Sequence, residues 1–211
     1  MKRKEITFLV TGLIAGMVCV TFPWSGSPWL AILGLTYGIG PLFFVAVLAG
    51  VLITGAWRQI PAQFLHYLAG IVLCTISYFL ALFAFFAVVG LASHALPFRQ
   101  SEKIHNFGLD VWLGLIAAGA VGASGITLFT ALLTGKWSNS LLVRLMLAAL
   151  VTILVTFIVN LPFQTDWSFL GVLFPLGNAL FSYLVGAHIW QHLKTEGRIP
   201  APASQPEQRP G

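Results

Sequence analysis

The sequence predicts an all-α integral membrane protein, a bundle of six transmembrane helices. Of the 211 residues, 58% are hydrophobic and 8% are charged, and the mean hydropathy is +0.90. A soluble domain carries about 25% charged residues, so a water-soluble bundle of this composition would lack the polar residues to cover its surface. Several uninterrupted apolar stretches also have the length, about 20 residues, that a helix needs to cross a bilayer.

Six apolar segments are interpreted as membrane spans. They cover residues 6–22, 30–57, 63–93, 109–134, 141–161 and 168–192, and with their loops they form one membrane domain, residues 1–195. The first segment is interpreted as a retained span, because the basic start MKRKE is followed by an apolar run without a small-residue cleavage site. Residues 196–211 are polar and rich in proline, and we expect them to form a disordered cytoplasmic tail.

The positive charges predict that both termini lie in the cytoplasm (N-in/C-in). With the N-terminus inside, only Arg99 and Lys103 fall in outer segments. The inner segments hold the other basic residues, Lys2, Arg3, Lys4, Arg58, Lys136, Arg144, Lys194, Arg198 and Arg209. This bias follows the positive-inside rule, and it favours one long span over two in the run at 63–93.

We therefore expect a bacterial cytoplasmic membrane, with the lipid bilayer as partner. Basic residues scattered at segment ends argue against nucleic acid as a partner.

The polar residues inside the spans suggest a ligand cavity. No acidic residue lies near a span centre, which argues against a pump with a carboxylate relay. Asn178 is the deepest strongly polar residue, and Pro175 removes a helix hydrogen bond beside it. Pro41 interrupts the second span in the same way. Broken helices line binding cavities in transporters, although proline and glycine also serve helix packing in membranes.

A cavity without charges suits a neutral or apolar ligand. The best interpretation is therefore a non-enzymatic protein: a small permease, a substrate-binding transport subunit or a membrane assembly partner. Small residues also lie at helical spacing in three spans and would let helices approach closely, either within one chain or in a homo-oligomer or partner complex. They are Gly12 and Gly16, Gly34 and Gly38, and Gly114, Ala118 and Gly122.

Three histidines lie at the inner ends of two spans. His188 and His192 are four residues apart and share one helix face, and His66 should lie at a depth similar to that of His188. Their imidazoles could form a single site for haem iron or another metal. Alternatively, they are polar side chains at the membrane–water boundary, near Trp190 and Lys194. We expect the boundary role and no bound cofactor.

A second alternative is an intramembrane serine protease. The GASG at residues 122–125 resembles the GxSG motif of the rhomboid intramembrane proteases, in which a serine of the fourth span works with a histidine of the sixth. This resemblance implies Ser124 as nucleophile and His188 as general base. The alternative role for Ser124 is that of a small residue on a tightly packed helix.

One further stretch, WRQIPAQFLH at residues 57–66, resembles the segment that opens the second span of the rhomboid family. Two features depart from the family pattern. The family's second-span histidine and asparagine fall here on Ile71 and Thr75, which cannot hold an oxyanion as the motif requires. The charge rule also places residues 57–66 inside, whereas the family has this stretch outside.

Overall fold

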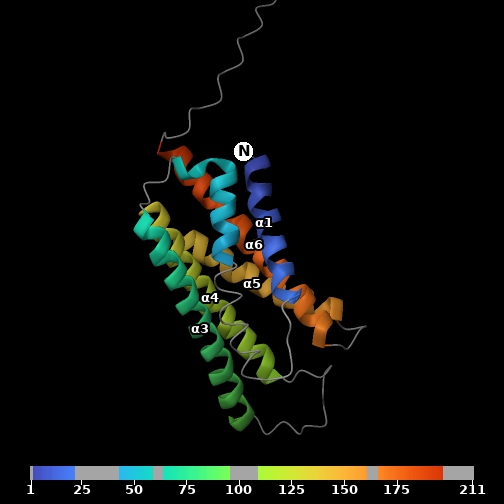
Figure 1. Ribbon diagram of the computed structural model, residues 1–211. Coiled ribbons are helices and arrows are strands. Elements are labelled where there is room, and N and C mark those ends of the chain that lie inside the picture. The colour runs from blue at the N-terminus through green and yellow to red at the C-terminus, as the bar shows by residue number, and fades with distance from the viewer. Residues whose placement is uncertain (1, 22–42, 59–63, 96–108, 161–165, 197–211) are drawn as a thin grey trace, which may run out of the picture.

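The computed structural model describes residues 2–21, 43–58, 64–95, 109–160 and 166–196, and every regular element in these ranges is a helix (Figure 1). A helix over Phe43–Thr54 precedes α3 and is followed by a 3-10 turn. The elements are α1 (Lys2–Thr21), η1 (Ala56–Arg58), α3 (Phe64–Ala95), α4 (Leu109–Thr134), α5 (Asn139–Asn160) and α6 (Asp166–Thr195).

Within these ranges, four helices are long and apolar enough to cross a membrane. The stretches are Leu65–Ala92, Asp110–Thr134, Asn139–Val159 and Val172–Thr195. The predictions of an all-helical chain and of helices suited to a membrane are therefore confirmed for the described residues. The helix Phe43–Thr54 covers part of the expected second span, whose residues 30–42 lie outside the described residues. The described part of the apolar run at 63–93, from Phe64 onward, is one continuous helix, α3.

The connection between α4 and α5 shows how local sequence ends one helix and starts the next. Gly135 follows the last residue of α4 with a φ of 72°, a conformation that costs glycine little. Its N–H donates to the carbonyl of Ala131 at 2.7 Å. The hydroxyl of Ser138 then accepts a hydrogen bond from the N–H of Leu141 at 3.2 Å, as a helix N-cap does. The result is a tight turn between α4 and α5.

Two closely packed helix pairs organise the bundle, with α3 lying along α4 and α1 along α6 (Figure 1). A Cβ placed at Gly70, near the start of α3, would lie 2.6 Å from the ring of Phe129, near the end of α4. A Cβ at Gly114, near the start of α4, would lie 2.7 Å from Val89, near the end of α3. The α3–α4 pair is therefore antiparallel, and α5 contacts both α4 and α6.

Gly12 and Gly16, the predicted close-packing pair of the first span, lie against α6. A Cβ at Gly16 would lie 2.5 Å from the Cα of Pro175, and a Cβ at Gly12 would overlap the carbonyl oxygen of Asn178. The pair therefore serves a contact within the chain. Gly114 packs against α3 in the same manner, while Gly34 and Gly38 lie outside the described residues.

Basic residues gather at one end of the bundle. The ammonium of Lys4, at the start of α1, lies 4.0 Å from the ring centroid of Trp190, near the end of α6. His192, also near the end of α6, contacts the end of α4, where Lys136 follows. The main hydrophobic core lies at this same end and includes Phe8, Val47, Phe129 and Ile189.

Large apolar side chains cover the outer faces of α3 and α5. Phe83 is 73% exposed and Leu91 is 71% exposed on α3, and Leu147 and Leu154 are exposed on α5. Monomeric soluble proteins rarely present apolar surface on this scale. Such faces suit contact with lipid tails.

Candidate functional site

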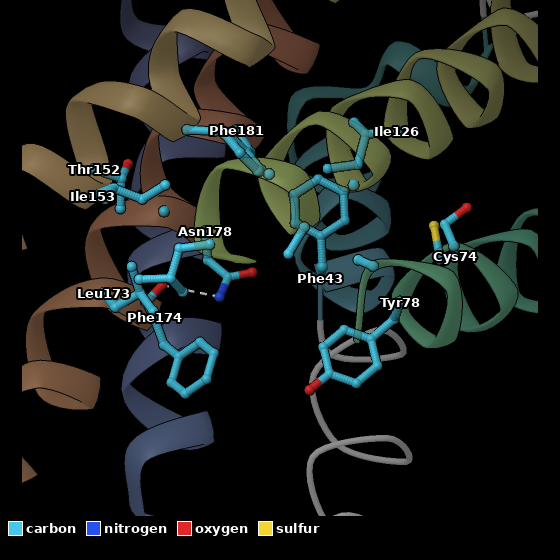
Figure 2. Close-up of a pocket in the computed structure, with 18 residues that line it drawn as sticks. Phe43, Cys74, Tyr78, Ile126, Thr152, Ile153, Leu173, Phe174, Asn178 and Phe181 are labelled. Carbon is cyan, nitrogen blue, oxygen red and sulfur yellow. Dashed lines mark hydrogen bonds between the residues drawn. The ribbon is translucent and has the colours of Figure 1, made fainter. Parts of the chain in front are cut away.

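A cavity of about 230 Å³ lies between α3, α4, α5 and α6 (Figure 2). Phe43, the first described residue of the helix before α3, also lines it. None of the described residues that line the cavity is charged. Its walls are mainly apolar and include Leu115, Ile126, Ile153, Leu173, Phe174 and Phe181.

Small residues explain why the cavity is not filled. Ala118, Gly119 and Gly122 of α4 line it, as does Gly177 of α6. A Cβ placed at Gly122 would have no heavy atom within 4 Å. The stripe of small residues predicted on α4 therefore packs against α3 at Gly114 and borders open space at Gly122.

Asn178 is the principal polar group of the α6 wall. The residue is 8% exposed, and its Nδ2 donates to the carbonyl of Phe174 at 3.0 Å. Its amide extends from α6 into the space facing α3 (Figure 2). The Oδ1 atom and the second N–H make no hydrogen bond with any described residue. A buried amide is costly to leave unpaired, so these atoms are available to a bound molecule.

Pro175 lies in the same turn of α6, directly after Phe174. It has no N–H, so one carbonyl of the preceding turn lacks its usual intrahelical partner. Of the two predicted cavity residues on this turn, Asn178 lines the cavity, whereas Pro175 is not among its lining residues and packs against Gly16 of α1. Pro41, the third predicted cavity residue, lies outside the described residues.

Polar residues of α3 line the cavity, and sequence reasoning missed them. Cys74, Ser77, Tyr78 and Ala81 all line it. The hydroxyls of Ser77 and Tyr78 form no hydrogen bond in the part of the chain that the structure describes. The spacing i, i+3, i+4, i+7 marks one helix face. This spacing of polar and small residues within a long apolar run was the signal that could have revealed them.

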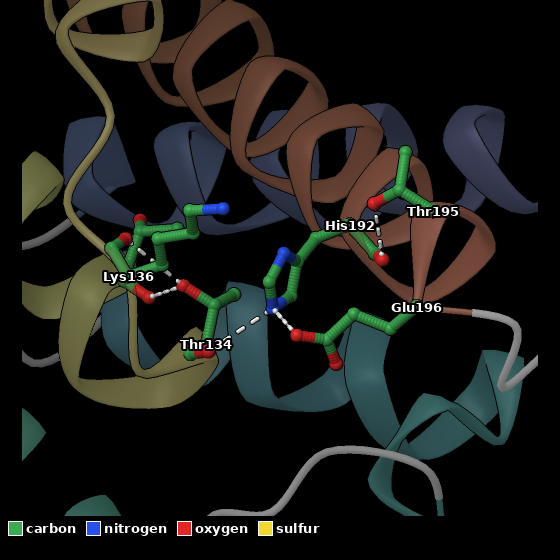
Figure 3. A network of polar contacts seen from close by, with 6 residues as sticks. Thr134, Lys136, His192, Thr195 and Glu196 are labelled. Carbon is green, nitrogen blue, oxygen red and sulfur yellow. Dashed lines mark hydrogen bonds and ion pairs between the residues drawn. The ribbon is translucent and has the colours of Figure 1, made fainter.

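His192 connects the ends of two helices (Figure 3). Its Nε2 lies 3.1 Å from the carbonyl oxygen of Thr134 and 3.1 Å from Oε1 of Glu196. The last carbonyls of a helix lack intrahelical partners, and His192 contacts one of them at the end of α4. Its observed role is thus a polar contact at the end of the bundle.

The three histidines of the alternative metal site do not form a ligand set in the structure. Within the described ranges, no group of three or more His, Cys, Asp or Glu side chains could hold a metal ion. His66 lies in the first turn of α3, whereas His188 and His192 lie near the end of α6. The described residues therefore do not support a three-histidine metal site, and a haem held by two of these histidines stays a prediction.

Ser124 and His188, the residues of the protease alternative, are not paired either. The hydroxyl of Ser124 donates to the carbonyl of Ala120 in its own helix at 2.9 Å. Among the described residues, no hydrogen bond joins it to His188, and Ser124 does not line the cavity.

No protein-family model matches the chain, and neither a curated protein nor a solved structure does.

Proposed function

We propose that this chain is a non-enzymatic membrane subunit that binds a neutral or apolar ligand in the cavity bordered by α3 and α6. It would act as a small permease, a substrate-binding transport subunit or a membrane assembly partner. The observation that carries the proposal is an apolar, uncharged cavity with the buried amide of Asn178 in its wall. Ligand sites are mainly apolar and orient their ligand with a few polar groups.

The position of Pro175 supports a transport-related role. Transporters often have helix-weakening residues beside their ligand sites, and α6 has Pro175 there although the helix runs unbroken through it. Here the turn with Pro175 also carries Asn178 into the cavity wall. Because lipid tails are as apolar as the cavity, the hydrophobic effect contributes little to moving a ligand from lipid into it. Shape and hydrogen bonding to Asn178 must then provide selectivity.

A substitution that fills the cavity with a side chain tests the proposal. In Gly122→Leu the new side chain enters the cavity, because nothing surrounds the position of its Cβ. Gly90→Leu is the matched control, since a Cβ at Gly90 also meets nothing within 4 Å and this residue does not line the cavity. Each protein is purified from membranes in mild detergent, and the small molecules that co-purify are identified by mass spectrometry.

We expect a neutral compound to co-purify with the wild-type protein and with Gly90→Leu, and to be lost from Gly122→Leu. The proposal is wrong if the compound stays with Gly122→Leu in the wild-type amount. It is also wrong if no neutral compound co-purifies with any of the three proteins, including preparations reconstituted with lipid extract.

We also propose that the chain crosses a bacterial inner membrane six times with both termini in the cytoplasm. The basic end of the bundle supports this orientation, because the positive-inside rule places such an end in the cytoplasm. A reporter enzyme that is active only outside the cytoplasm should be inactive when fused after Glu196 and active when inserted in the segment 96–108. Activity of the first fusion would refute the orientation.

A further inference from the structure

The size of the cavity limits the part of a ligand that it can enclose. An apolar cavity of about 150 Å³ holds one benzene molecule. The cavity here measures about 230 Å³, which by proportion corresponds to roughly nine non-hydrogen atoms. Phe43, Phe174 and Phe181 lie in its walls, and aromatic walls pack well against a ring or a short alkyl chain.

The hydrogen-bonding groups in the wall limit the chemistry of the ligand. An amide offers two acceptor sites on oxygen and two N–H donors. Asn178 uses one N–H on the carbonyl of Phe174, so an acceptor and a donor remain unused by the described residues. A hydroxyl both donates and accepts and can satisfy both atoms. An ether can satisfy only the donor, and a hydrocarbon satisfies neither.

The opposite wall agrees with this chemistry. Ser77 and Tyr78 of α3 are uncharged polar residues that line the cavity, and they form no hydrogen bond within the described ranges. The Ser77 hydroxyl lies against Gly125 of α4, so Asn178 is the polar group that orients the ligand. No described wall residue is charged. A carboxylate or an ammonium group would therefore be buried without a counter-charge, which is strongly unfavourable.

From these observations we infer that the cavity takes a neutral amphiphile, namely a compact apolar body with a hydroxyl head bonded to the amide of Asn178. This inference rests on the proposed function and adds the chemical class of the ligand. The body is a single ring with a short chain or a group of similar size.

Four small probes that share one propyl-substituted benzene ring test the inference. They are 4-propylphenol, its methyl ether, propylbenzene and 4-propylbenzoate. Binding is measured by equilibrium dialysis against full-length protein in lipid nanodiscs, with empty nanodiscs to subtract partitioning. Asn178→Leu keeps a similar side-chain shape and removes the amide. Thr75→Val is the control, because this hydroxyl of α3 bonds to the carbonyl of Ile71 and does not line the cavity.

We expect 4-propylphenol to bind saturably and about fivefold more tightly than propylbenzene, as one net hydrogen bond predicts. The methyl ether should lose part of this preference, and 4-propylbenzoate should show no saturable binding. Asn178→Leu should bind both propylbenzene and 4-propylphenol with the affinity that the wild type has for propylbenzene. Thr75→Val should keep the full preference.

The possible failures are distinct. If the phenol and the hydrocarbon bind the wild type equally, or if Asn178→Leu keeps the preference, the hydroxyl inference is wrong while the ligand cavity stands. If no probe binds the wild type saturably, the inference fails. The proposed function is then decided by the co-purification experiment, in which the compound should be lost from Gly122→Leu and kept by Gly90→Leu. Binding of propylbenzene reports whether the Asn178→Leu variant is folded. If the variant is not folded, the order of the four probe affinities on the wild-type protein decides whether the hydroxyl inference holds.

Discussion

Gly16 of α1 lies against the turn of α6 that contains Pro175. A proline in a helix leaves a carbonyl without its partner and weakens the turn, so this turn depends on its neighbours. Gly12 and Gly16 bring the backbone of α1 close to one side of it, while Asn178 reaches the cavity from the same turn. Gly12 and Gly16, which have no side chain, thus hold in place the turn of α6 that carries Asn178.

Gly16→Ala should destabilise the protein. Its Cβ would lie 2.5 Å from the Cα of Pro175 and 2.6 Å from the carbonyl oxygen of Phe174, and backbone atoms cannot yield as a flexible side chain does. Overpacking of this kind costs about 1–3 kcal/mol, which thermal unfolding in detergent can detect. Gly90→Ala is the control, with no neighbour near its Cβ. Equal stability of the two variants would contradict the contact between α1 and α6.

At the level of elements, α6 connects the bundle. It packs along α1, contacts α5, lines the cavity and reaches the end of α4 through His192. The long contact with α1 is made by small residues and the core, whereas the contact with the end of α4 is polar. The two types of contact hold α6 at several points along its length, which keeps the turn with Pro175 at a defined place beside the cavity.

His192→Ala should loosen the contact between the ends of α6 and α4. The variant loses the interaction with the carbonyl of Thr134 and the contact with Glu196. A net hydrogen bond is worth about 0.5–1.5 kcal/mol, so a small decrease in thermal stability is expected. Thr195→Ala is the control, because that hydroxyl bonds to a carbonyl of its own helix. A decrease no larger than the control's would show that this contact does not stabilise the bundle.

At the scale of the whole molecule, the exposed apolar faces and the basic end both fit a lipid bilayer. The outer faces of α3 and α5 match lipid tails, and helices satisfy their backbone groups internally, as a bilayer requires. Lys4 and Lys136 lie at one end, with the main core beneath them. The polar contacts of His192 lie at the basic end, and the cavity lies among the apolar helices.

Much of the helical structure could be predicted from the sequence. Helix α4, Leu109–Thr134, covers the same residues as the predicted fourth span, and the described part of the run at 63–93 is one helix. Asn178 was predicted as a cavity residue from its depth and its neighbour Pro175. Ser77 and Tyr78 were not predicted. Their spacing with Cys74 and Ala81 marks one face of α3, but the spacing alone does not tell which helices that face meets.

The sequence by itself determined that the chain is helical, apolar and basic at its segment ends, because composition and helix length depend on residues close together in the chain. Only the tertiary structure decided that Gly16 meets Pro175 and that Asn178 shares a cavity with Tyr78. These pairs lie on different helices, far apart in the sequence. Whether two such residues meet depends on how the surfaces of their helices fit together, and local sequence does not encode that fit.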